Sequence, residues 1–254
     1  MSDLVLPGLA GRTALVTGAS RGIGAGIAKA LAARGARVVL TGRDKAALEA
    51  VTAEIRAKGG EAAHFTADVT DEDALAHLRD AAEQSFGPAT LLVVCAGGGG
   101  RGGPLVEETT AAWRAALEAN LTSAFLTLKT FLPPMYEAGQ GAVVLMSSSA
   151  ARQLSGASAA YAAAKAGLQS LMRQAAAEAA PKGVRVNAIA PSAIVTEQLA
   201  AQPASVLDEI AKGFPLRRLG SVDDVSAGTL FLLSEAASWI TGVTLDLAGG
   251  RVMV

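Results

Sequence analysis

The chain has few of the features that mark secreted or membrane-bound proteins. Among its 254 residues Cys95 is the only cysteine, so no disulfide can form within the chain, which is compatible with a reducing compartment. Residues 1–4 lack the basic stretch and the long apolar run of a signal peptide, and no apolar segment reaches membrane-spanning length. We therefore expect a soluble, cytoplasmic protein without a membrane partner.

The sequence also lacks an excess of charge and a metal-binding pattern. The formal net charge is -1 and charged residues make up 18% of the chain, so no electrostatic footprint points to nucleic acid. The histidines, His64 and His77, have no metal-ligand spacing and no pairing with a carboxylate site. We expect a small-molecule partner, no nucleic acid and no metal.

What the chain does contain is a regular alternation of two kinds of segment. An apolar fraction of 51% can bury one large core, and no proline-rich or charged linker divides the chain. Short β-branched runs predict strands at 12–17, 37–41, 62–66, 90–95, 142–147, 185–190 and 244–247. Alanine-rich segments of helical period predict helices at 23–34, 45–58, 71–86, 111–136, 158–180 and 222–234. This pattern predicts an α/β fold of one domain, with a doubly wound, seven-stranded parallel sheet and helices on both faces.

Residues 192–215 do not fit this alternation. Pro203, Gly213 and Pro215 interrupt any helical period there. Long irregular stretches at the ligand edge of such a sheet are commonly lids, so we expect a substrate lid, with an ordinary surface connection as the alternative.

A glycine-rich turn follows the first predicted strand. Residues 17–24 read Thr-Gly-Ala-Ser-Arg-Gly-Ile-Gly and lead directly into a predicted helix. Glycines allow a sharp turn and a close approach to a pyrophosphate, while the helix N-terminus offers free amides and the positive end of its dipole. In this setting between strand and helix, the turn predicts a dinucleotide-binding site.

Tyr161 and Lys165 form the second informative motif. A step of four residues on a helix puts both side chains on one face. A phenol, with a reference pKa of about 10, is a poor acid or base near neutral pH. An ammonium held beside it is expected to lower that pKa and make Tyr161 usable for proton transfer.

The two motifs together resemble those of the classical short-chain dehydrogenase/reductase family. The resemblance, Thr-Gly-x-x-x-Gly-x-Gly at 17–24 and Tyr-x-x-x-Lys at 161–165, extends over residues 12–250. It implies one Rossmann-type domain over residues 1–254 and usually a homotetramer. The alanine-rich segments 111–136 and 158–180 would allow the close helix contacts of such an assembly.

The resemblance also implies roles for individual residues. Asn120, Ser148, Tyr161 and Lys165 match the catalytic tetrad, in which Asn120 holds a water and Ser148 orients the substrate. Because strand side chains alternate, Ser147 and Ser149 should cap or buttress instead. The implied cofactor contacts are Gly18, Ser20, Arg21, Gly22, Ile23, Gly24, Arg43, Asp68, Val69, Ala96, Gly97, Tyr161, Lys165, Pro191, Ile194 and Thr196.

The end of the second predicted strand bears on the kind of nicotinamide cofactor. NAD enzymes need an acidic residue there for the ribose 2′-hydroxyl, whereas arginine suits the 2′-phosphate of NADP. The strand ends Thr-Gly at 41–42, followed by Arg43, and Arg21 adds a second cation. This favours NADP(H), with Asp44 expected to cap the next helix.

Two positions depart from the family pattern. Ser192 follows Pro191 where the family has glycine, which affects the expected backbone conformation. Cys95 replaces the usual asparagine, and we expect it to behave as a small buried hydrophobe that has lost a hydrogen bond. Residues 97–103 should form a flexible arm, in which we expect Arg101 to be solvated, with a contact to a substrate carboxylate or phosphate as the alternative.

These residues predict hydride transfer between NADP(H) and a carbonyl or secondary alcohol substrate, that is, a ketone reductase. The first alternative is a 3-oxoacyl-[acyl-carrier-protein] reductase of fatty-acid or polyketide synthesis, with Lys182 and Arg185 as candidate contacts for an acidic carrier protein. The others are a sugar or polyol dehydrogenase and a catalytically silent nucleotide-binding regulator.

Overall fold

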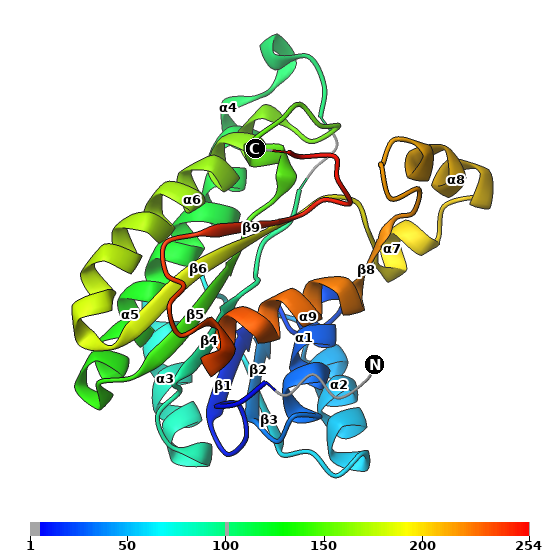
Figure 1. The fold of residues 1–254 in the computed structure, drawn as a ribbon. Helices are drawn as coiled ribbons and strands as arrows, with labels where there is room; N and C mark the ends of the chain where they lie inside the picture. Colours follow the sequence, from blue (N-terminus) through cyan, green and yellow to red (C-terminus); the bar gives the residue numbers. More distant parts are fainter. Residues whose placement is uncertain (1–5, 100–101, 254) are drawn as a thin grey trace.

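One parallel sheet organises the molecule (Figure 1). The computed structural model describes residues 6–99 and 102–253. The sheet has the order β3-β2-β1-β4-β5-β6-β9, and all of its pairings are parallel. Its strands are β1 (Thr13–Thr17), β2 (Arg37–Gly42), β3 (Ala62–Thr66), β4 (Leu91–Val94), β5 (Gly141–Met146), β6 (Val184–Pro191) and β9 (Thr244–Leu247). The prediction of a doubly wound, seven-stranded α/β sheet is confirmed.

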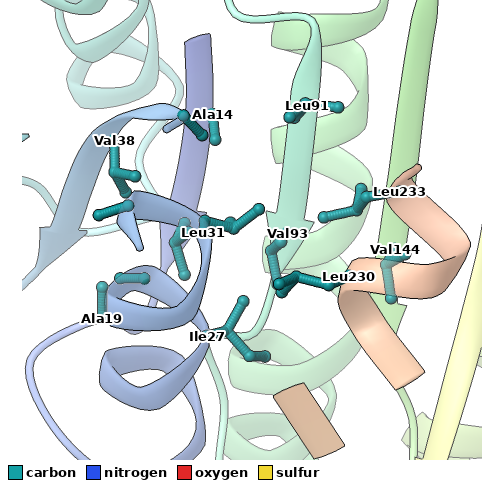
Figure 2. Packing of buried hydrophobic residues seen from close by; sticks show 14 of the residues in the cluster. Ala14, Ala19, Ile27, Leu31, Val38, Leu91, Val93, Val144, Leu230 and Leu233 are labelled. Carbon is teal, nitrogen blue, oxygen red and sulfur yellow. The ribbon is translucent and has the colours of Figure 1, made fainter. Parts of the chain in front are cut away.

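Helices cover both faces of the sheet. One face carries α1 (Gly22–Ala32), α2 (Lys45–Ala57) and α9 (Val222–Leu233), and the other carries α3 (Glu72–Phe86), α5 (Ser123–Ala138) and α6 (Ala159–Ala179). Side chains of β1 alternate between the two cores, with Val16 in the first and Leu15 in the second. Figure 2 shows Ile27 of α1 and Leu230 of α9 packed around Val93. Burying each such side chain contributes about 1.5–3 kcal/mol.

The helix predicted at 111–136 is interrupted. It consists of α4 (Thr110–Leu117), a π-helical turn η2 (Glu118–Thr122) and α5. The Nδ2 of Asn120 donates to the Ala116 carbonyl oxygen (3.0 Å), within the stretch where the helix widens. Alanine-rich periodicity does not reveal such a turn, because the local sequence favours helix on both sides of it.

The segment 192–215 is more regular than its sequence predicts. It contains β7 (Ile194–Val195), which pairs with β8 (Gly220–Ser221), and the helices α7 (Glu197–Ala200) and α8 (Ala204–Lys212). Pro203 and Gly213 lie at the two ends of α8, so these residues delimit a helix rather than exclude one. Figure 1 shows α7 and α8 projecting beyond the end of the sheet.

Four short 3₁₀ segments complete the described elements: η1 (Leu105–Glu107), η3 (Ser149–Ala151), η4 (Ala180–Lys182) and η5 (Glu235–Ala237). Over residues 6–99 and 102–253, we find no helix with the length and apolar character needed to cross a bilayer.

The strand order reverses between β1 and β4. In doubly wound sheets the crevice at such a reversal, outside the carboxyl ends of the strands, is where ligands bind. The fold therefore directs attention to the segments that follow β1, β4, β5 and β6.

Candidate active site

A cavity of about 1130 Å³ lies at this edge of the sheet. It brings together every residue predicted for cofactor contact, and three of the four predicted catalytic residues, Ser148, Tyr161 and Lys165. Asn120 is fully buried next to the cavity and does not line it. Lining residues that the sequence reasoning missed include Thr70, Met146, Glu197 and Gln198.

The glycine turn after β1 is shaped by close contacts that exclude side chains. Gly18 has a φ of 66°, and a Cβ there would lie 2.9 Å from the Cα of Ala96. A Cβ on Gly24 would overlap with the carbonyl oxygen of Gly18. Arg21, the N-cap of α1, provides no side-chain capping bond, so the first-turn amides remain available for an anion. The turn therefore fits a pyrophosphate.

The end of β2 presents a cation. Arg43 is exposed and lines the cavity, and its charge helps to lower the pKa of Asp68. The Asp44 side chain accepts from the Ala47 amide (3.1 Å) at the start of α2, so the prediction that Asp44 caps this helix is confirmed. Asp44 also lines the cavity, but its carboxylate is engaged in this cap, and β2 itself ends at Gly42 without a carboxylate.

Asp68 is not a helix cap. Its Oδ1 accepts from the Thr70 amide (3.0 Å) and the Thr70 hydroxyl (2.7 Å), and these bonds are the main reason why the pKa of Asp68 lies below its usual value. The cap of α3 is Asp71, whose carboxylate accepts from the amides of Asp73 and Ala74.

Helix α6 carries Tyr161 and Lys165 into the cavity. The Ser158 hydroxyl caps its first turn by accepting from the Tyr161 amide (3.2 Å). The Lys165 Nζ donates to the Met146 carbonyl oxygen (2.8 Å) and lies 5.6 Å from the centroid of the Tyr161 ring. The last residue of β5 therefore fixes the ammonium over the ring face.

The pKa values of this pair differ from expectation. Burial raises the pKa of Tyr161, and a hydrogen bond with Ser148 opposes that shift. Burial lowers the pKa of Lys165 to about 8. The expected lowering of the Tyr161 pKa by Lys165 is wrong for this structure, because desolvation of the phenol dominates. A phenol that keeps its proton at neutral pH suits proton donation.

Ser147 and Ser148, which follow β5, make different contacts. The Ser148 Oγ accepts from the Ala150 amide (3.1 Å), and the side chain lines the cavity. The buried Ser147 donates to the Lys165 carbonyl oxygen (3.2 Å) and accepts from Nε2 of Gln169 (3.0 Å). Ser147 is thus a buttress, as predicted. The sequence analysis did not identify Gln169. Its position one helical turn after Lys165, on the same face of the helix, could have indicated a role beside the site.

Asn120 holds the segment that follows β4. Its Oδ1 accepts from the Gly98 amide (3.1 Å), and its Nδ2 donates to the Gly98 carbonyl oxygen (3.0 Å). A Cβ on Gly97 would lie 2.5 Å from that Oδ1. These bonds and the bond to Ala116 satisfy both polar atoms of the buried Asn120 side chain.

Both departures from the family pattern are accommodated. Cys95 packs against the core but also lines the cavity, so the prediction of a buried position was only partly right. Burial raises the pKa of its thiol to about 11, and the Thr17 hydroxyl accepts from its backbone amide (3.0 Å). Arg217 is the only non-glycine with a positive φ in the described ranges, so Ser192 causes no left-handed strain.

Several other candidates lie away from the cavity. The Arg185 guanidinium donates to backbone carbonyls of residues 232–234 and 240, so its proposed contact with a carrier protein is wrong. Lys182 precedes β6, at the sheet edge opposite the cavity. His64 lies 3.9 Å from Glu49, and the described residues contain no cluster suited to a metal ion. Arg101 lies outside the described residues.

Fold and site together define a Rossmann-type dinucleotide-binding protein, and comparison with known proteins identifies its family. The family model described as enoyl-(acyl carrier protein) reductase matches residues 18–251. Cis-4-hydroxycyclohexanecarboxylate dehydrogenase of Sinomonas cyclohexanicum is 41% identical over 96% of this chain and 97% of its own. The chain belongs to the short-chain dehydrogenase/reductase family, whose members are nicotinamide-dependent oxidoreductases acting on alcohols and ketones.

Two solved structures match nearly the whole chain. A 3-oxoacyl-[acyl-carrier protein] reductase from Brucella melitensis has a TM-score of 0.92 and 32% identity, covering 100% of this chain and 98% of its own. A 7α-hydroxysteroid dehydrogenase complexed with NADH and 7-oxo glycochenodeoxycholic acid has a TM-score of 0.90 and 36% identity, covering 97% and 96%.

Proposed function

We propose that the protein is an NADP(H)-dependent carbonyl reductase that interconverts a ketone and a secondary alcohol. The observation that carries this proposal is the single cavity that joins the glycine turn to Ser148, Tyr161 and Lys165. The turn's uncapped helix amides and its closely packed glycines suit a pyrophosphate, so the residues present fit the cofactor.

The nicotinamide, when bound, supplies the hydride for reduction or accepts it in oxidation. In reduction the Ser148 hydroxyl hydrogen-bonds the substrate carbonyl oxygen, and the Tyr161 phenol donates a proton to the developing alkoxide. The Lys165 ammonium stabilises the phenolate that remains, and by family resemblance it also holds ribose hydroxyls. Asn120 fixes the neighbouring segment through its bonds to Gly98. By family resemblance, a water held by Asn120 would link Lys165 to solvent.

Arg43 is proposed to select NADP(H) over NAD(H), with Arg21 as a second cation. An Arg43→Leu variant is expected to raise the KM for NADPH about tenfold, the effect of one charge-assisted hydrogen bond, and to leave the KM for NADH nearly unchanged. Steady-state kinetics with both cofactors measure this, with the exposed Arg173→Leu as control. Equal changes with both cofactors would count against the assignment.

The reduction rate is expected to fall as the pH rises through about 8. The pKa of Lys165 lies near 8, so the ammonium is lost above that pH, whereas Tyr161, with its raised pKa, keeps its proton. The pH profile of kcat/KM, which reports groups of the free enzyme, measures this limb. A profile that stays flat to pH 10 would contradict the role of Lys165.

Reduction of a 3-oxoacyl-[acyl-carrier-protein] is the second candidate, favoured by the likeness to the Brucella reductase. A sugar or polyol dehydrogenase and a silent nucleotide-binding regulator complete the alternatives. The test is a screen of NADPH and NADH consumption against cyclic ketones, 3-oxoacyl thioesters, quinones and sugars. Turnover of ketones but not of thioesters supports the first proposal, and nucleotide binding without any turnover overturns it.

We also propose that the chain forms a homotetramer in the cytoplasm and that residues 192–215 act as a substrate lid. The small side chains of α6 would allow the close helix contacts of a tetramer. A monomeric mass in solution scattering would count against the assembly.

A further inference from the structure

We propose that Gln169 is a positioning residue that aligns Lys165 with Ser148 through the hydroxyl of Ser147. The inference rests on the proposed function, since it concerns the geometry of the same catalytic groups. Gln169 itself does not line the cavity, so it acts only through its neighbour.

The hydrogen bonds run in one direction. Nε2 of Gln169 donates to Ser147 Oγ (3.0 Å), and Ser147 Oγ donates to the Lys165 carbonyl oxygen (3.2 Å). A serine hydroxyl has one proton, and the amide donor occupies a lone pair, so that proton is directed to Lys165. Without Gln169, the hydroxyl is free to rotate away.

The strand end and the helix are thereby joined at two neighbouring points. The Lys165 Nζ bonds to the carbonyl of Met146, and the Lys165 carbonyl bonds to the side chain of the next residue, Ser147. Ser148 follows directly, so this double contact sets the distance between the substrate-orienting hydroxyl and the ammonium. Gln169 is buried and does not line the cavity, so water cannot readily take the place of its amide donor.

The buried residues of α6 indicate that the amide of Gln169 does more than fill space. The buried positions of the helix are apolar except for two, Lys165 and Gln169. Burying an amide costs free energy unless it is hydrogen-bonded, and an apolar side chain at 169 would fill the same space without that cost. The amide of Gln169 lies where it can orient Ser147.

The test is a double-mutant cycle of Gln169→Met, which keeps length but removes the donor, and Ser147→Ala. Each single variant is expected to lower kcat about tenfold, because small displacements of catalytic groups are costly, while the Kd for NADPH stays within twofold. If the two residues act as one unit, the double variant is no slower than the slower single variant. Ser147→Thr, which keeps the hydroxyl, should retain kcat within about threefold.

Gln174→Leu is the matched control, because Gln174 is an exposed glutamine on the same helix. Full kcat in Gln169→Met, or losses that multiply in the double variant, would overturn the proposal. Thermal melting separates unfolding from misalignment. If the wild-type chain reduces no ketone, the proposed function fails by itself. In that case, amide hydrogen exchange at residues 145–149 still tests the contact between Gln169 and Ser147. Exchange should be faster in Gln169→Met and unchanged in Gln174→Leu. Unchanged exchange in both variants would refute the contact.

Discussion

A Tyr161→Phe variant is expected to lower kcat for ketone reduction by about 10² to 10⁴, the usual contribution of one general acid. The substitution removes the phenolic proton and keeps the ring that packs beneath the Lys165 ammonium. The Kd for NADPH should therefore change little. Stopped-flow reduction under single-turnover conditions, together with nucleotide titration, measures both quantities.

Tyr136→Phe is the control for this experiment, since Tyr136 on α5 is the only other tyrosine and does not line the cavity. It should leave kcat unchanged. Turnover by Tyr161→Phe equal to that of the wild type would refute the proton-donor assignment, and with it the proposed mechanism.

A Gly24→Ala variant is expected to lose most of its affinity for the dinucleotide. The added methyl group would overlap with the Gly18 carbonyl oxygen, which belongs to the turn's backbone and cannot rotate away as a side chain could. Overpacking of this kind costs about 1–3 kcal/mol, and relief by moving the turn displaces the amides that face the pyrophosphate. If this displacement costs about 1.4 kcal/mol of binding free energy, the affinity for NADPH falls roughly tenfold.

Calorimetric titration with NADPH and thermal melting with and without it measure the effect. Gly103→Ala is the matched control, because a Cβ there meets no atom within 4 Å and its φ is not positive. Wild-type affinity in Gly24→Ala would mean that the dinucleotide does not use this turn.

The fold and the location of the site could be predicted because both depend on local patterns. Strand and helix periods differ, and the glycine turn at residues 17–24 needs only neighbouring residues to define it. Asn120, by contrast, was recognised as important, but its bonds to Gly98 come from a segment 22 residues away in the sequence. Such contacts depend on tertiary packing, which one sequence does not reveal.

The pKa of Tyr161 illustrates the same limit. Sequence spacing correctly placed Lys165 on the same helix face, but the sign of the shift depends on how deeply the phenol is buried. The helix α8 was missed for a different reason: Pro203 and Gly213, which suggest breaks in the sequence, are its N-cap and C-cap. The helix α7 has only four residues, too few to show a helical period.

The short β7–β8 ladder closes a segment of the chain that lies outside the large sheet. It pairs residues 194–195 with residues 220–221, so the two ends of the intervening segment lie side by side. This ladder is separate from the seven-stranded sheet. Substitutions and insertions within residues 199–212, which lie outside the cavity lining and before the buried Phe214, can therefore alter what reaches the cavity without disturbing the register of β6 or β9. Substrate range in this architecture can diverge while the chemistry of Tyr161 and Lys165 stays fixed.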